Sequence, residues 1–277
     1  MATWQIRGRE FSLEKTLVMG ILNVTPDSFS DGGLHFSVDN ALRRAEEMIA
    51  EGADIIDIGG ESSRPGSKPI TADEEISRVA PIIEAIAKRF DTPVSVDTYK
   101  SAVARAAVDA GAAIINDISA FRFDATMPET VAELKTGVVL MHSRGTFETL
   151  HSTPPAEDIF DDVSRDFRRA LDASQAAGIA DNAIALDPGI GFGKTLDQNL
   201  ALISGIDKLI KQFPAYPFLI GTSRKSFIGK LLDGAPVEQR LAGSLATAVI
   251  AARSGVRIVR THDIKETSAA LKIVDAL

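Results

Sequence analysis

Residues 17–33, reading LVMGILNVTPDSFSDGG, decide the fold of this chain. An apolar run from Leu17 to Leu22 stops at Asn23, and the segment behind it is rich in Thr, Pro, Asp, Ser and Gly. A short apolar run bounded by turn-forming residues is typical of a buried parallel strand that leads into a loop. Because ligands bind where the carboxyl ends of parallel strands meet the following loops, Asn23 is a candidate site residue.

The same design recurs along the chain. Seven further strands are predicted at residues 54–58, 93–97, 113–116, 137–142, 183–187, 217–221 and 256–260. Helical apolar stripes lie between them at residues 37–51, 71–90, 101–110, 160–174, 196–211, 237–254 and 265–276, with a short helical segment before residue 137. Eight strands that alternate with helices predict a (β/α)8 TIM barrel over one domain, residues 1–277. A short β-hairpin from Trp4 to Phe11 precedes it, and Pro81 is expected to kink or split the second helix.

An internal spacing supports this count of strands. Gly52, Gly111, Gly137 and Gly255 each precede a predicted strand, and a polar residue follows each of them five positions later. These polar residues are Asp57, Asn116, His142 and Arg260. We expect each glycine to end a helix and each polar side chain to emerge at the opposite rim of the sheet.

Composition narrows the function classes. Of the 277 residues, 45% are hydrophobic and 25% are charged, which is ordinary for a globular chain with a large core. The net charge of −8 argues against nucleic acid or a membrane surface as partner. Cysteine is absent, which excludes disulfides and thiolate chemistry and fits a reducing compartment. No apolar run approaches the ~20 residues of a membrane span or forms a signal peptide, so we expect a cytoplasmic protein.

Polar residues stand at the predicted strand ends. They are Asn23, Asp57, Asp97, Asn116, His142, Asp187, the loop 221–225, and Arg260 to His262. In a barrel these side chains converge on one cavity, where burial is costly unless a ligand or a counter-charge satisfies them. Any single Asp could instead cap a helix or pair with an Arg, and that alternative stays open.

Three motifs that suggest other chemistry fail on spacing. GIGFGKT, from Gly189, would need Gly in place of Pro188 to be a phosphate-binding loop, and Gly in place of Lys194 to be a dinucleotide motif. GTSRK, from Gly221, has Lys225 where a nucleophile elbow needs Gly. The four histidines show no zinc-binding spacing, so no structural metal is expected.

Seven motifs together resemble one enzyme family. They are ILNVTPDSFSDGG, GGESSRPG, SVDTYK, INDISAF, LDPGIGFGK, GTSRKSFIG and VRTHD. The combination, which runs from Val18 to the carboxyl terminus, resembles the dihydropteroate synthases, folate-pathway enzymes that join a pterin diphosphate to p-aminobenzoate. The resemblance implies a magnesium ion, these two small-molecule substrates, a homodimer and a target of sulfonamides.

The resemblance also implies roles for single residues. The pterin would be held by Asp97, Asn116, Asp187 and Lys225, with Ile118, Met141, Phe192 and Gly221 in the substrate site. Asn23 would bind the magnesium of the diphosphate, and Arg260, Thr261 and His262 would lie at the diphosphate. The p-aminobenzoate site would be shaped by Phe29, Ser63, Arg64, Pro65, Lys225 and Ser226. Asn23, Arg64, Asp97 and Lys225 are the implied catalytic residues. Ser63 stands where the family usually has Thr, and since the hydroxyl survives we expect a minor effect on binding.

The chemistry of these side chains fits the implied substrates. A carboxylate such as Asp187 can accept the paired N–H groups of a pterin edge, while an amide and an ammonium suit its carbonyl and ring nitrogens. A weak amine nucleophile and a well-neutralised diphosphate predict departure before attack, with Asp97 facing the cationic methylene carbon. Two rival functions are a folate-dependent methyltransferase and a catalytically inactive pterin-binding paralogue. The SRKS and RTHD motifs argue against the first, and the presence of Asn23, Arg64, Lys225 and His262 argues against the second.

Overall fold

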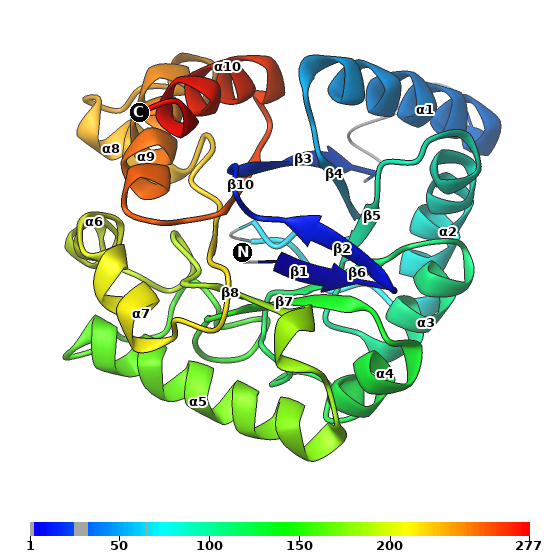
Figure 1. The fold of residues 1–277 in the computed structure, drawn as a ribbon, viewed down its shortest axis with the longest axis horizontal. Coiled ribbons are helices and arrows are strands. Elements are labelled where there is room, and N and C mark those ends of the chain that lie inside the picture. Colours follow the sequence, from blue (N-terminus) through cyan, green and yellow to red (C-terminus); the bar gives the residue numbers. More distant parts are fainter. Residues whose placement is uncertain (1–2, 25–32, 65) are drawn as a thin grey trace.

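The eight predicted strands form one parallel sheet. The computed structural model describes residues 3–24, 33–64 and 66–277. In sheet order the strands are β8 (Ile184–Asp187), β7 (Gly137–Met141), β6 (Ile114–Asp117), β5 (Val94–Asp97), β4 (Ile55–Gly59), β3 (Leu17–Asn23), β10 (Ile258–Thr261) and β9 (Leu219–Ile220). A parallel bridge between Leu186 and Phe218 joins the two ends of the sheet. The sheet therefore closes into the predicted barrel (Figure 1).

Helices surround the barrel, as Figure 1 shows. They are α1 (Gly33–Glu51), α2 (Ala72–Arg89), α3 (Ser101–Asp109), α4 (Met127–Leu134), α5 (Ile159–Ala177), α6 (Leu196–Ser204), α7 (Ile206–Gln212), α8 (Ser226–Leu231), α9 (Leu241–Arg253) and α10 (Ile264–Asp275). Their apolar faces pack on the outside of the strands in one large core cluster. Within the described ranges, none of the helices is both long and apolar enough to cross a membrane.

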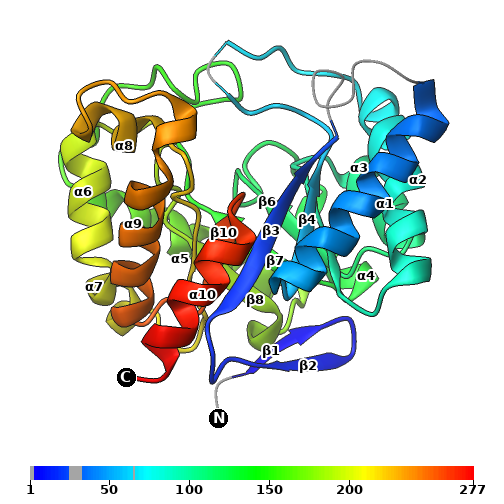
Figure 2. The same cartoon turned by 90° about the horizontal axis from the view of Figure 1, so that it is seen from above.

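The predicted hairpin closes the amino-terminal end of the barrel. Strands β1 (Thr3–Ile6) and β2 (Arg9–Ser12) pair antiparallel. Trp4 is fully buried, and its indole N–H donates to the carbonyl of Ala183 at 2.9 Å. Figure 2 shows the hairpin at one end of the barrel and the long loops at the other. The hairpin seals the core, which leaves the opposite rim for ligands.

The alternation of side chains along the strands builds the barrel interior in layers. The lower layer is apolar and packs against the hairpin; its strand members are Leu17, Met19, Ile55, Ile114, Val139, Ala185, Leu219 and Ile258. Successive side chains of a strand point to opposite faces, so the residue two positions later also points inward. Those next inward residues include Asp57, Asn116, Asp187 and Arg260. The polar strand ends therefore sit directly on an apolar floor.

Three helix predictions need correction. Pro81 does not split its helix, because α2 runs through it from Ala72 to Arg89. The stripe predicted as one helix over 196–211 is two helices, α6 and α7, which meet at Gly205. A Cβ at Gly205 would lie 2.9 Å from the ring of Phe160 in α5, so the break lets the two segments approach closely.

The helix predicted from Val237 begins four residues later. Val237–Gln239 is a 3₁₀ turn, and α9 starts at Leu241. Arg240 turns back at this point and donates to the carbonyls of Ala235 at 2.9 Å and Arg224 at 3.0 Å. The six-residue helix α8 is too short to show a periodic apolar pattern and is absent from the predicted helices.

The glycine spacing is correct at three of its four positions. Gly52, Gly111 and Gly255 have φ values of 104°, 119° and 105°, the left-handed region that ends a helix. Gly137 instead is the first residue of β7. There the left-handed position after α4 belongs to Lys135, at φ 52°.

Candidate active site

Two carboxylates share one guanidinium inside the rim. Arg260 of β10 donates from Nε to Asp57 Oδ2 at 2.6 Å and from Nη2 to Asp97 Oδ2 at 2.7 Å. Asn116 also donates to Asp57 Oδ2, at 3.2 Å. Burial raises the pKa of Asp97, and Arg260 opposes that rise. Burial disfavours the charged form of Arg260, but Asp57 and Asp97 outweigh it and raise its pKa, so the guanidinium stays charged.

A second charged pair faces the first from β8 and the loop after β9. Asp187 is 5% exposed, and its Oδ1 accepts the backbone N–H of Gly189 at 2.7 Å. Burial raises the pKa of Asp187, while Lys225 and the Gly189 N–H lower it. Burial also lowers the pKa of Lys225 to about 8, against the attraction of Asp187. Asp187 thus presents a buried carboxylate that has one oxygen engaged by its own loop.

Lys225 lies across two glycines and an aromatic ring. Its Nζ donates to the carbonyl of Ile190 and sits 4.7 Å from the centre of the Phe192 ring. A Cβ at Gly191 would lie 3.0 Å from the Lys225 side chain, and a Cβ at Gly221 would lie 3.8 Å from its Nζ. The two glycines therefore make room for the lysine stem between the β8 and β10 ends of the cavity.

Lys194 holds the loop between Asp187 and α6 through hydrogen bonds to its backbone. Its ammonium donates to the carbonyls of Gly189 at 2.8 Å and Phe192 at 3.1 Å. Burial lowers the pKa of Lys194 to about 7, and Asp187 opposes this. Thr195 is the N-cap of α6 and forms a capping box with Gln198. The GIGFGKT segment is thus a tied loop that presents Phe192.

Donors for an anion gather beside Arg260. His262 Nδ1 lies 3.1 Å from Ser223 Oγ, which also accepts the backbone N–H of His262 at 3.1 Å. Ser223 Oγ can donate its own hydrogen to Nδ1 while it accepts that N–H, and in this arrangement Nε2 is the protonated nitrogen of a neutral ring. Burial, together with Arg260 and Arg224, lowers the pKa of His262 to about 4. A bound anion would oppose this lowering of the His262 pKa.

Asn23 lies next to Asp97 across one strand. Gly59 pairs with Asn23 on one side and with Asp97 on the other. A Cβ on Gly59 would lie 3.8 Å from Asn23 Oδ1 and 3.6 Å from Asp97 Cβ. Among the residues that the structure covers, no three His, Cys, Asp or Glu side chains form a metal-holding group. One amide oxygen fits magnesium only where phosphate oxygens and water supply the rest, which is how this ion is usually bound.

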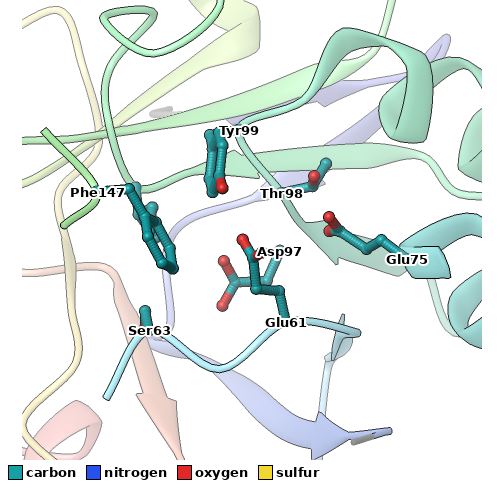
Figure 3. Close-up of a pocket in the computed structure, with 8 residues that line it drawn as sticks. Glu61, Ser63, Glu75, Asp97, Thr98, Tyr99 and Phe147 are labelled. Carbon is teal, nitrogen blue, oxygen red and sulfur yellow. The ribbon is translucent and has the colours of Figure 1, made fainter. Parts of the chain in front are cut away.

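A pocket opens beside Asp97 (Figure 3). It is lined by Glu61, Ser63, Glu75, Asp97, Thr98, Tyr99, Ile118 and Phe147. In Figure 3 Asp97 and Glu61 lie between Phe147 on one side and Glu75 on the other. Lys100 Nζ binds Glu75 at 2.6 Å and Glu61 at 3.0 Å, and Glu61 also accepts the backbone N–H of Ile70 at 2.6 Å. This ion-pair cluster holds both ends of the Ser63 loop against β5.

Replacing Lys100 with Met should destabilise the fold. Glu75 is 1% exposed, so loss of its cation leaves a buried carboxylate unpaired and costs about 3 kcal/mol of unfolding free energy. The matched control is Lys88→Met, whose pair with Glu84 is exposed and worth under ~1 kcal/mol. Urea unfolding at pH 7 measures both. Burial raises the pKa of Glu75, so the loss should shrink as the pH falls and Glu75 takes up a proton; equal losses at the two lysines would contradict this assignment.

Most of the predicted site residues lie together at this rim. Inward-facing positions at or just after the strand ends are occupied by Asn23, Asp97, Asn116, Met141, Asp187, Gly221 and Arg260. The loops above them carry Ser63, Ile118, Phe192, Lys225 and His262. Ser226 is the exposed first residue of α8, and Arg64 lies in the exposed part of the loop after β4. The predictions for Phe29 and Pro65 fall outside the described residues.

Two strand-end residues point elsewhere. Thr261 is buried, and its hydroxyl lies 3.1 Å from Thr267 Oγ1 and accepts the N–H of Asp263, so it shapes the turn into α10. His142 is buried beside Asp162 of α5 at 3.3 Å, and burial lowers its pKa to about 3. Both residues support the rim from behind and do not line its cavity.

No specific site role is predicted from the sequence for Asp57, Ser223, Lys194 or the Glu61–Lys100–Glu75 cluster. Asp57 carried the same signal as Asp97, a carboxylate at a strand end, and could have been selected on that ground. Ser223 and the ion-pair cluster depend on contacts between distant segments, and Lys194 binds backbone carbonyls of its own loop. Their sequence patterns are those of ordinary polar loop residues.

The fold and the site define an enzyme of the barrel class. The carboxyl-terminal rim offers paired carboxylates, an amide and an ammonium for a polar ring, and beside them Arg260 and His262 for an anion. Comparison with known proteins agrees. The family model described as "Pterin binding enzyme" matches residues 19–262. The dihydropteroate synthase of Clostridium beijerinckii is 46% identical over 275 residues, 99% of this chain and 98% of its own.

Solved structures give the same answer. The Yersinia pestis dihydropteroate synthase in a sulfonamide drug complex superposes with a TM-score of 0.92 at 46% identity, covering 99% of this chain and 98% of that one. The Xanthomonas albilineans enzyme with 4-aminobenzoic acid also reaches 0.92, at 41% identity, covering 99% and 97%. The chain belongs to the pterin-binding enzyme family and, within it, to the dihydropteroate synthases, which are transferases.

Proposed function

We propose that the inner polar layer of this barrel binds 6-hydroxymethyl-7,8-dihydropterin diphosphate and condenses it with p-aminobenzoate to give 7,8-dihydropteroate and diphosphate. One observation carries the proposal: Asp187, Asn116 and Lys225 lie at the same rim above an apolar floor. Asn116 binds the Asp57 that Arg260 also binds, Arg260 binds Asp97, and Asp187 and Lys225 are close enough for each to shift the pKa of the other. A carboxylate, an amide and an ammonium match the donors and acceptors along the edge of a pterin. Met141 and Ile118 supply apolar contact with its ring.

The diphosphate belongs at the Asn23–His262 side of the cavity. His262 offers an N–H donor, and Arg260 has Nη1 beyond the two nitrogens that bind Asp57 and Asp97. Magnesium, when bound through Asn23 and the phosphate oxygens, would neutralise charge on the leaving group. Arg64, exposed in the loop after β4, would add a further cation when that loop meets the ligand.

Departure of the diphosphate precedes attack by the amine in this proposal. The bond between the pterin methylene carbon and the diphosphate oxygen breaks first, and positive charge develops on that carbon. Asp97 lies at the junction of the pterin and diphosphate regions, where its carboxylate stabilises this charge. The amine nitrogen of p-aminobenzoate then forms the new C–N bond and releases a proton. Walls from the loops around Ser63 and Phe192 keep water from the cation.

The p-aminobenzoate site should be complete only when diphosphate is present. Titration calorimetry of the free enzyme with p-aminobenzoate is expected to show weak or undetectable heat. Addition of pterin, magnesium and pyrophosphate together should produce binding at micromolar concentration, because the anion draws the exposed Arg64 side chain over the site beside Ser63. Equal affinity in both conditions would show a preformed pocket and contradict the ordered mechanism. A sulfonamide should follow the same dependence and compete with p-aminobenzoate.

The outer face of α9 supports a homodimer. Ala242, Ala246 and Ile250 are exposed along it, with the half-buried Leu245 and Val249 between them. Apolar residues at this spacing form a continuous stripe on one side of a helix, which a second copy would cover. Sedimentation velocity distinguishes dimer from monomer.

The absence of cysteine and the role in folate synthesis support a cytoplasmic location for this proposed single-domain enzyme.

A further inference from the structure

His151 lies in the long loop between β7 and α5 and reaches two other loops of the rim. Its Nε2 is 2.8 Å from the carbonyl oxygen of Ser63, in the loop after β4. A carbonyl oxygen only accepts, so Nε2 carries the hydrogen and donates it. The contact spans 88 positions in the sequence and ends on the backbone of a proposed p-aminobenzoate residue.

The face of the same imidazole ring packs against the loop after β8. The His151 and Phe192 rings stack with centroids 5.7 Å apart and an interplanar angle of 26°. Phe192 in turn lies 4.7 Å from the ammonium of Lys225, the residue assigned to both substrates. His151 therefore connects the Ser63 segment to the Phe192–Lys225 wall.

The loop that carries His151 is tied down on both sides of it. Leu150 is 1% exposed, and a Cβ on Gly193 would come within 2.8 Å of its carbonyl oxygen. Thr149 accepts the backbone N–H groups of Ser152 at 2.9 Å and Thr153 at 3.0 Å through its carbonyl. An imidazole on such a support is held in place at little further entropic cost, so its two contacts can fix the segments that it touches.

We propose that His151 is a positioning residue that fixes the Ser63 segment against the Phe192 ring and thereby sets the affinity for p-aminobenzoate. This inference rests on the proposed function, since it concerns the same site. The imidazole does not touch the reacting atoms, and the pterin contacts at Asp187 and Asn116 do not depend on it. Lys194 holds the Phe192 loop without help from His151, so the effect should fall on p-aminobenzoate and largely spare the pterin.

Three variants separate the two contacts. His151→Gln keeps an N–H donor without the stack, His151→Phe keeps the stack without the donor, and His151→Ala removes both. In the presence of pterin, magnesium and pyrophosphate, His151→Ala should bind p-aminobenzoate roughly tenfold more weakly, and the other two roughly threefold. Affinity for the pterin diphosphate should stay within about twofold of wild type in all three variants.

Glu148→Ala is the matched control, because Glu148 is exposed in the same loop and, among the residues that the structure describes, its side chain binds only Thr146. It should leave both affinities unchanged. The inference would be overturned if His151→Ala bound p-aminobenzoate as tightly as wild type, or if it lost affinity for both substrates equally. Wild-type turnover would uphold the proposed function in either case. If the wild-type enzyme itself failed to release pyrophosphate, the proposed function would fail first.

Discussion

Asp187→Asn is expected to lower kcat/KM for the pterin diphosphate by roughly a thousandfold, about 4 kcal/mol. The substitution is nearly isosteric, and the remaining amide oxygen can still accept the N–H of Gly189, which now lies 2.7 Å from the carboxylate. What is lost is a charged acceptor for the paired donors of the pterin. An NH₂ group placed against those donors leaves both sides without partners in a buried site.

The control for this prediction is Asp197→Asn, which removes an exposed carboxylate from the first turn of α6. It should leave kcat/KM within about twofold of wild type. Steady-state pyrophosphate release and direct titration with pterin measure the two effects. A loss of less than tenfold in Asp187→Asn would mean that the pterin edge is bound by other residues.

Arg260→Met should damage both stability and turnover. Asp57 is fully buried, and its other oxygen, Oδ1, has no hydrogen-bond partner among the described residues. Removal of the guanidinium leaves that carboxylate unpaired, which costs about 3–5 kcal/mol of unfolding free energy. The rate should fall roughly hundredfold or more, since a donor to the diphosphate and the partner that orients Asp97 are lost together.

The double variant Asp57→Asn, Arg260→Met separates these two effects. A neutral amide at residue 57 removes the unpaired charge, so most of the lost stability should return in urea unfolding. Turnover should stay low, because Asp97 still lacks Arg260 and the anion still lacks a donor. Recovery of turnover together with stability would show that Arg260 serves only the fold. No recovery of stability would show that Asp57 is not the source of the loss.

The barrel could be predicted because its signals are local. Each strand is a short apolar run that ends at a polar residue. Side chains of a strand alternate between its two faces, so a residue two positions after an apolar floor residue also points inward and lies at the rim. Ile55 and Asp57, Ile114 and Asn116, and Ile258 and Arg260 all follow this rule. The rule needs no knowledge of distant segments.

The errors arise where tertiary contacts override local patterns. Phe160, 45 positions earlier, sets the break at Gly205. The late start of α9 follows from the hydrogen bonds that the Arg240 side chain donates to the carbonyls of Ala235 and Arg224. Position 137 was expected to cap a helix because glycines do so elsewhere in this chain, yet Lys135 takes the left-handed turn there.

The site residues divide in the same way. The resemblance implied roles for residues that are proposed to bind the substrate, such as Asp187 and Lys225. It implied none for Lys100 or His151, because these residues gain their roles from partners in other segments, nor for Lys194, whose partners are backbone carbonyls of its own loop. The sequence alone also cannot say whether a strand-end carboxylate binds a ligand or a counter-charge. Asp57 is fully buried and accepts from Arg260 and Asn116, while Asp97 shares Arg260 and also lines the pocket.

Pyrophosphate release tests the central claim most directly. Wild-type enzyme is incubated with the pterin diphosphate, p-aminobenzoate and magnesium, and with each of the three omitted in turn; Asp187→Asn is run beside it. We expect release at a rate that requires the pterin diphosphate and magnesium, with dihydropteroate formed in equal amount when p-aminobenzoate is present. Absence of release from the complete mixture by folded wild-type enzyme would contradict the account and favour an inactive pterin-binding paralogue.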